Sequence, residues 1–130
     1  MPYNILIVDD SETVRAVIAR TLEMAGVAVS TLHQASNGEE ALEVMKNNWI
    51  DLVFSDINMP VMGGVEMIER MQESDLLGTV PVVVVSTEGS KTRIDDLLSK
   101  GVRAYIRKPF TPEKVKAVVE ELLGGDNRES

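Results

Sequence analysis

The stretch Val82-Val83-Val84-Val85 places a β-branched apolar side chain at four successive positions. A strand with one face in water alternates apolar and polar residues, whereas a strand that is apolar throughout has to be covered on both faces. Weaker or shorter runs occur at residues 5–8, 27–34, 52–54 and 104–106, and the valine run itself extends over residues 80–85. Five such runs predict a parallel sheet that lies between two layers of helices.

Helical patterns separate the five predicted strands. Residues 14–25 carry apolar side chains such as Val17 at helical spacing, with Arg15 among the polar residues on the other side. Gly26 follows this helix as a left-handed cap would. The alternation predicts an α/β fold of the doubly wound, flavodoxin-like (βα)5 type, with sheet order 2-1-3-4-5. The register of the second strand stays open, because residues 26–34 are more than one strand needs.

Composition narrows the functional classes. The chain has 130 residues, of which 44% are hydrophobic and 26% charged, and we expect one globular domain over residues 1–123 and a short flexible tail over 124–130. The absence of cysteine excludes disulfides and thiolate nucleophiles, and a single histidine argues against a histidine-rich zinc site. A net charge of −8 argues against nucleic-acid binding. Because neither a signal peptide nor a membrane-spanning run stands out, we expect a cytoplasmic protein without membrane contact.

Polar and charged residues follow the predicted strands at the edge where parallel strands end. Asp9-Asp10 comes after the first strand, Asp56 after the third, Ser86-Thr87 after the fourth and Lys108-Pro109 after the fifth. Three crowded carboxylates raise one another's pKa unless a cation neutralises them, and oxygen ligands at an open site suit Mg²⁺, with Mn²⁺ as an alternative ion. An aspartate beside Mg²⁺ can act as a nucleophile and form an aspartyl phosphate, with the lysine opposing the phosphoryl charge.

Each of these residues also has a simpler structural interpretation. Asp9-Asp10 alone would suit the positive end of the following helix, and Ser86 could merely end a strand. Lys108 could be an ordinary exposed lysine, and Tyr105 could be core packing. What favours a functional site is the convergence of several charged groups on the edge where such sheets bind their ligands.

Five motifs run through the chain in a fixed order. They are Leu6-Ile7-Val8-Asp9-Asp10, Ser36-Asn37-Gly38-Glu39-Glu40-Ala41-Leu42, Ser55-Asp56-Ile57-Asn58-Met59-Pro60-Val61-Met62-Gly63-Gly64, Val85-Ser86-Thr87-Glu88 and Tyr105-Ile106-Arg107-Lys108-Pro109-Phe110. This set resembles the receiver domain of two-component response regulators. The resemblance covers residues 4–123, and within the family it is greatest to the stand-alone, CheY-like chemotaxis type.

The resemblance implies a role for each residue at the predicted edge. Asp56 would accept a phosphoryl group from the histidine of a sensor kinase or from a small phosphodonor. Asp10, Asp56 and the backbone carbonyl of Asn58 would bind Mg²⁺ directly, and Asp9 would hold a metal-bound water. Lys108 would bind a phosphoryl oxygen, and the peptide bond to the proline after it would be cis.

The resemblance also implies a conformational switch. Ser86 and Tyr105 match a pair in which the hydroxyl moves to the phosphoryl group and the ring turns inward, changing the face of the fourth helix, fifth strand and fifth helix. Asn58 and Glu88 match positions that tune loss of the phosphoryl group, and they predict a short-lived aspartyl phosphate. Thr87 is larger than the residue usual in the family and would restrict the approach of a phosphodonor or of water.

The leading hypothesis is a phosphorylation-controlled binding module, not an enzyme with a separate substrate, that promotes its own phosphorylation and dephosphorylation. Its partners would be a sensor histidine kinase and an output protein, either a flagellar motor switch or a phosphorelay protein, and it would be a monomer or weak dimer. A phosphorelay intermediate and a protein-contact adaptor are the nearest alternatives.

Two other functional classes fit the sequence poorly. A flavin-binding electron carrier needs a loop rich in hydroxyl residues and glycine after the first strand, where this chain has Asp9-Asp10-Ser11-Glu12. A Mg²⁺-dependent phosphatase commonly has an Asp-x-Asp pair there, whereas the two aspartates of this chain are adjacent.

Overall fold

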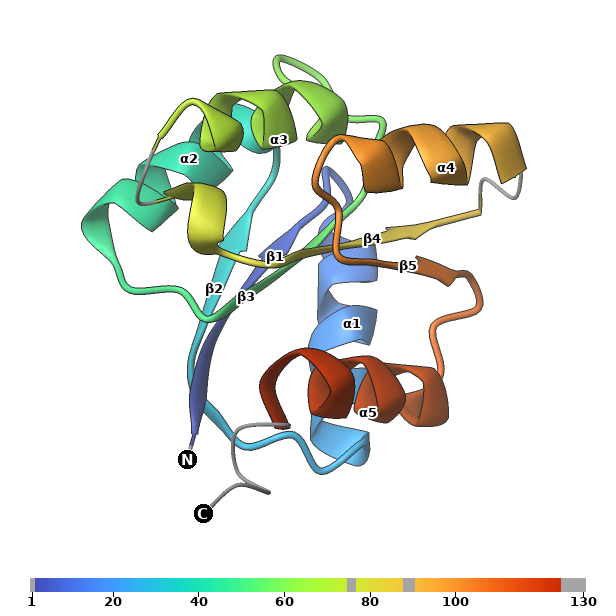
Figure 1. Ribbon diagram of the computed structural model, residues 1–130. Coiled ribbons are helices and arrows are strands. Elements are labelled where there is room, and N and C mark those ends of the chain that lie inside the picture. The colour runs from blue at the N-terminus through green and yellow to red at the C-terminus, as the bar shows by residue number, and fades with distance from the viewer. Residues whose placement is uncertain (1, 75–76, 88–90, 125–130) are drawn as a thin grey trace.

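The computed structural model describes residues 2–74, 77–87 and 91–124, and Figure 1 shows a central sheet between helices. The strands are β1 (Tyr3–Val8), β2 (Val29–Ala35), β3 (Leu52–Ser55), β4 (Val82–Ser86) and β5 (Ala104–Arg107). The helices are α1 (Glu12–Met24), α2 (Gly38–Asn47), α3 (Gly64–Gln72), α4 (Lys91–Ser99) and α5 (Pro112–Val119), with short turns η1 (Leu77–Thr79) and η2 (Glu120–Gly124). None of the helices in these ranges is long and apolar enough to cross a bilayer. The tail predicted from residue 124 onward falls, from residue 125, outside the described residues.

The five strands are parallel, and their order in the sheet is β2-β1-β3-β4-β5. A helix joins each strand to the next, and the direction of winding reverses between β2 and β3. As a result α1 and α5 cover one face of the sheet, and α2, α3 and α4 cover the other (Figure 1). The predicted doubly wound fold and strand order are confirmed.

The valines of β4 alternate between two hydrophobic cores, one on each face of the sheet. Val82 and Val84 pack in the core under α2, α3 and α4, which contains Met45, Ile68 and Leu97. Val83 and Val85 pack in the core under α1 and α5, which contains Ile18, Leu22, Val115 and Val119. None of the four valines is more than 3% exposed. Full burial of one such side chain contributes about 1.5 kcal/mol or more, which explains why no polar residue interrupts the run.

β2 begins two residues later and ends one residue later than predicted. Tyr3 of β1 pairs with Val29, whereas its neighbour Asn4 pairs with Thr31, so Ser30 is the extra residue of a β-bulge. The region looked too long for one strand because it contains this inserted residue together with the end of the connection from α1. A pattern of period two cannot show where such an insertion falls.

The packing of α1 differs from the prediction in two places. Ile18 and Leu22 are buried, but Val17 is 52% exposed. Successive residues of a helix point about 100° apart, so a helix that directs Ile18 and Leu22 at the sheet turns Val17 towards water. Arg15, predicted on the outer side, is half-buried and folds back over the end of β1. Gly26 has a φ of +75° and ends the helix in the predicted left-handed conformation.

The loop between β3 and α3 contains a strained residue. Val61 has a φ of +67°, and the Met62 N–H donates to the Pro60 carbonyl at 2.7 Å, which closes a three-residue turn around it. A β-branched side chain rarely adopts a positive φ, because Cβ then crowds the backbone. Val61 is also 76% exposed, so burial of its side chain offsets little of the strain.

We expect Val61→Gly to stabilise the protein. Glycine relieves strain of about 1–3 kcal/mol, and this exceeds the roughly 0.4–1 kcal/mol by which its freedom favours the unfolded chain. The expected gain in unfolding free energy is about 1 kcal/mol, measured by urea denaturation. Val17→Gly is the matched control, since the same substitution on the exposed side of α1 should lower stability by about 0.5 kcal/mol. A loss of stability in both variants would contradict the strain at Val61.

Candidate metal centre

Backbone hydrogen bonds just beyond the strand ends place Asp9 and Asp56 side by side. The Asp9 N–H donates to the Ala35 carbonyl at 3.1 Å, and the Asp56 N–H donates to the Val8 carbonyl at 3.0 Å. These bonds extend the pairing of β1 with β2 and with β3 by one residue. The register of the sheet therefore brings two carboxylates that are distant in the sequence to the same edge.

The carboxylates of Asp9, Asp10 and Asp56 form a cluster, in which one oxygen of each lies within 4.8 Å of the others. Asp9 is only 3% exposed, Asp56 is half-buried and Asp10 is exposed. The cluster thus offers several oxygen donors and opens to solvent on one side. A Mg²⁺ ion prefers such a site, because it keeps several of its waters while it binds one or two carboxylates.

Burial and neighbouring charges oppose the ionisation of Asp9. Burial is the largest cause and raises the pKa of Asp9 above its ordinary value, and the charges of Asp56 and Asp10 raise it further. The Ser11 N–H, which donates to Asp9 Oδ1 at 2.9 Å, and the Lys108 charge lower this pKa without reversing the shift. A divalent cation among the three carboxylates would remove the repulsion, so the residues present fit a metal ion.

Asp56 lies at the start of the loop between β3 and α3, whose two ends pack against each other. Its Oδ1 accepts the Ile57 N–H at 2.7 Å, and its other oxygen accepts no hydrogen bond from the described residues. The Gly64 N–H donates to the Ile57 carbonyl at 2.8 Å, and a Cβ at position 64 would collide with the Asp56 carbonyl oxygen. Glycine at this position therefore allows the start of α3 to pack directly on the backbone of Asp56.

Lys108 follows β5 at the same edge. The Lys108–Pro109 peptide bond is cis, as the resemblance implied. The Lys108 N–H donates to the Ser86 carbonyl at 2.9 Å, which ties the segment to the end of β4. Its ammonium lies close enough to Asp9 to lower the pKa of that carboxyl. The positive charge of Lys108 thus acts on the cluster through Asp9.

An aromatic pair joins the segments that carry Asp56 and Lys108. Phe54 is fully buried in β3 and meets Phe110 edge to face, with ring centroids 5.8 Å apart and an interplanar angle of 86°. Phe54 lies two residues before Asp56, and Phe110 lies two residues after Lys108. The two rings therefore pack next to the carboxyl-terminal edge of the sheet, where Asp56 and Lys108 lie.

The other predicted site residues occupy different environments. Ser86 is the last residue of β4 and is buried, whereas Tyr105 in β5 is half-buried against the core under α2, α3 and α4. Asn58 and Thr87 are exposed in the loops that follow β3 and β4. Glu88 lies outside the described residues. The functional roles of these five residues stay predictions.

Two residues that shape the site, Gly64 and Arg15, were not among the predicted site residues. Gly64 belongs to a Gly-Gly pair, and glycine at the start of a helix is a signal that another part of the chain comes close. Arg15 donates from Nη1 to the Asp9 carbonyl at 2.6 Å. No sequence signal separates Arg15 from the exposed polar residues of α1, because its contact depends on how the helix docks against β1.

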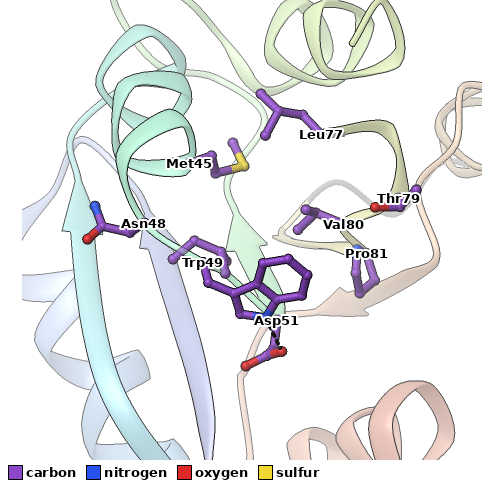
Figure 2. Close-up of a pocket in the computed structure, with 9 residues that line it drawn as sticks. Met45, Asn48, Trp49, Asp51, Leu77, Thr79, Val80 and Pro81 are labelled. Atoms are coloured by element: carbon purple, nitrogen blue, oxygen red, sulfur yellow. Dashed lines mark hydrogen bonds between the residues drawn. The ribbon is translucent and has the colours of Figure 1, made fainter. Parts of the chain in front are cut away.

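A pocket of about 140 Å³ lies at the opposite, amino-terminal edge of the sheet (Figure 2). It is lined by Met45, Asn48, Trp49, Ile50, Asp51, Leu77, Thr79, Val80 and Pro81. The Trp49 indole N–H donates to Asp51 Oδ1 at 2.9 Å, and Asp51 Oδ2 accepts the Asn4 N–H at 2.8 Å. The carboxylate of this pocket is thus engaged in structural bonds, and no predicted site residue lines it.

Comparisons with known proteins agree on one family. Residues 5–120 match the model of the response regulator receiver domain. The chain is 36% identical over 122 residues to the chemotaxis protein CheY homolog of Campylobacter jejuni, covering 93% of this chain and 92% of that protein. It is 35% identical to chemotaxis protein CheY1 of Helicobacter pylori, covering 93% of this chain and 97% of that protein. The structure of the chemotaxis response regulator CheY4 of Vibrio cholerae superposes with a TM-score of 0.82 at 29% identity, covering 95% of this chain and all of that one.

We expect Mg²⁺ to stabilise the folded protein, and to do so more strongly at neutral than at acidic pH. Because the pKa of Asp9 is raised in the folded state, the unfolded chain loses this proton first as the pH rises, and the metal-free folded state loses stability over that range. A cation that binds the ionised cluster reverses this loss. At 100 times its Kd, Mg²⁺ should add about 2.7 kcal/mol, measured by thermal unfolding near pH 7 and near pH 4.5.

Two Asp→Asn variants serve as test and control. Asp9→Asn should abolish most of the Mg²⁺ effect and flatten the pH dependence of the metal-free protein. Asp95→Asn, on an exposed position of α4, should change neither quantity. Equal stabilisation of both variants by Mg²⁺ would contradict a metal centre at the cluster.

Proposed function

The chain belongs to the family of response regulator receiver domains, and from this premise we propose that it is a phosphorylation-controlled switch of a two-component pathway. The observation that carries the proposal is the gathering of Asp9, Asp10 and Asp56 at one sheet edge, with the charge of Lys108 acting on Asp9. Phosphoryl transfer depends mainly on alignment and charge neutralisation, and these residues can supply both. Asp56 is the proposed phosphoacceptor, since one of its oxygens accepts no hydrogen bond from the described residues.

Receiver domains bind Mg²⁺ at an acidic pocket, and the aspartate cluster is the acidic pocket of this chain. We propose that Asp10, Asp56 and the Asn58 carbonyl bind the ion directly, and that Asp9 binds it through water. Mn²⁺ would suit the same oxygen ligands. When bound, the ion supplies positive charge against the carboxylates and the incoming phosphoryl oxygens.

The proposed transfer uses the carboxylate of Asp56 as nucleophile. Its free oxygen attacks the phosphorus of a kinase phosphohistidine, a P–O bond forms and the P–N bond breaks. The imidazole leaves with the bonding electron pair, and the Lys108 ammonium binds a phosphoryl oxygen. In the return step water attacks the phosphorus and releases inorganic phosphate, which restores the carboxylate. The chain is therefore a phosphoacceptor that promotes its own phosphorylation and dephosphorylation, not an enzyme with a separate substrate.

The proposed output is a population shift on the face made by α4, β5 and α5. The Ser86 hydroxyl would bond the phosphoryl group, and the ring of Tyr105 would turn inward. A phosphoryl group shifts such an equilibrium only by its different interaction with the two states, here one hydroxyl bond and the Lys108 contact. These interactions would bias the equilibrium between the two conformations by a few kcal/mol, and the downstream partner would bind the face exposed in the favoured one.

We propose a sensor histidine kinase as the upstream partner and a flagellar switch protein as the downstream one. The motor-type output is favoured because the chain covers over nine-tenths of relatives that are named chemotaxis proteins. A phosphorelay protein is the alternative downstream partner. We also propose that the protein is cytoplasmic and a monomer or weak dimer.

A flavin-binding electron carrier stays disfavoured, because the loop after β1 carries Asp9 and Asp10 where the flavin phosphate would have to bind.

The first test is the intact mass of the protein after incubation with acetyl phosphate and Mg²⁺. Wild type should gain one phosphoryl group, and the gain should vanish in Asp56→Asn and with a chelator. Asp95→Asn, a matched substitution on exposed α4, should be phosphorylated like wild type. Phosphorylation that persists in Asp56→Asn would overturn the assignment of the nucleophile.

A second test concerns the lifetime of the phosphorylated state. We expect the aspartyl phosphate to decay within minutes at most. Asn58→Ala and Glu88→Ala should each change the rate of this decay severalfold, which corresponds to about 1 kcal/mol in the activation free energy. Thr87→Ala should speed phosphorylation by acetyl phosphate, because it removes a side chain from the exposed approach. Decay by phosphate release can be followed directly. A phosphorylated state that lasts for hours, and whose lifetime is unchanged in Asn58→Ala and Glu88→Ala, would contradict the hypothesis that these two residues tune loss of the phosphoryl group.

A further inference from the structure

The side chain of Arg15 joins three segments next to the aspartate cluster. Arg15 lies in the first turns of α1, and its Nη1 donates to the carbonyl oxygen of Asp9 at 2.6 Å. Its Nε donates to the Gln34 side-chain oxygen on β2 at 3.0 Å. The two bonds use different nitrogens of one rigid, planar guanidinium, so the position of the Asp9 carbonyl is fixed relative to both α1 and β2.

Three different groups of Asp9 are therefore hydrogen-bonded. Its N–H donates to the Ala35 carbonyl, its carboxylate accepts the Ser11 N–H, and its own carbonyl accepts from Arg15. The Asp9 carbonyl and the Asp10 N–H belong to the same planar peptide unit. A side chain that fixes this carbonyl therefore fixes the plane that joins the two acidic residues, and with it the position of the Asp10 Cα.

The effect of Arg15 on the cluster is geometric. Its two bonds at this edge go to a backbone carbonyl and to the Gln34 side-chain oxygen, and no ion pair joins the guanidinium to a carboxylate among the described residues. Its charge acts elsewhere: the pKa of Glu40 is lowered chiefly by hydrogen bonds from Ser36 and, to a smaller extent, by Arg15. The bond at the metal centre is made to the backbone.

We propose that Arg15 is a positioning residue for the metal centre, which orients the Asp9–Asp10 pair before a divalent cation arrives. The inference rests on the proposed function, since it concerns the same cation site. A lysine could not replace Arg15, because one ammonium on a flexible stem cannot hold the Asp9 carbonyl and Gln34 in a fixed relation. Groups that orient metal ligands in this way typically contribute about 10–100-fold to metal affinity.

The test compares Mg²⁺ affinity, by titration calorimetry well below the unfolding temperature, in wild type, Arg15→Ala, Arg15→Lys, Gln34→Leu and Arg20→Ala. The two Arg15 variants should each weaken binding about tenfold, and Gln34→Leu, which removes one anchor at an exposed position, about two- to threefold. Arg20→Ala, exposed on the same helix, should match wild type. In the metal-free protein, amide exchange at Ser11 should accelerate in both Arg15 variants but not in Arg20→Ala.

The outcomes separate the inference from its alternatives. Wild-type affinity in Arg15→Lys would show that charge alone matters, and wild-type affinity in all variants with a lowered Tm would show a purely structural role. Either result overturns the inference while the proposed function stands. If an Arg15 variant does not fold, Gln34→Leu decides by the same criterion. Absence of Mg²⁺ binding in wild type would overturn the proposed function, and this inference with it.

Discussion

The burial of a parallel sheet on both of its faces is the constraint on which the rest of this structure depends. Val82 to Val85 can alternate between two cores only because α2, α3 and α4 lie on one side and α1 and α5 on the other. Such coverage requires a helix between successive strands, so every strand runs in the same direction. All five carboxyl ends then meet at a single edge, where polar residues that have no place in either core can gather.

At that edge the stability of the fold and the chemistry of the site are in conflict. The sheet register forces Asp9 and Asp56 together, burial and the neighbouring carboxylates raise the pKa of Asp9, and the Lys108 charge compensates only in part. Structures that leave such repulsion in place generally do so where another species will bind. The backbone around the cluster is held by the close packing at Gly64 and by the bond from Arg15, so a backbone shift that would separate the carboxylates is opposed.

The sequence predicted the features that depend on local pattern. The parallel sheet and the acidic residues after its strands follow from periodicity and from where each apolar run ends. The strand order follows from the arrangement common to five-stranded doubly wound sheets, and the cap from the glycine at position 26. The bulge at Ser30 and the inward turn of Arg15 were not predictable, because both are set by contacts with β1 rather than by their own neighbours. The positive φ of Val61 was hidden for the opposite reason, since a valine there runs against local preference.

The edge-to-face contact of Phe54 with Phe110 links the segment that carries the Asp56 carboxylate to the segment that carries the Lys108 ammonium. Neither ring carries a reactive group, yet each lies two residues from one that does. Exchange of these two paired side chains would therefore adjust the distance between carboxylate and ammonium while Asp56 and Lys108 stay in place. Evolution of signalling speed in this fold would then appear as correlated changes between one buried and one half-buried position rather than at the site itself.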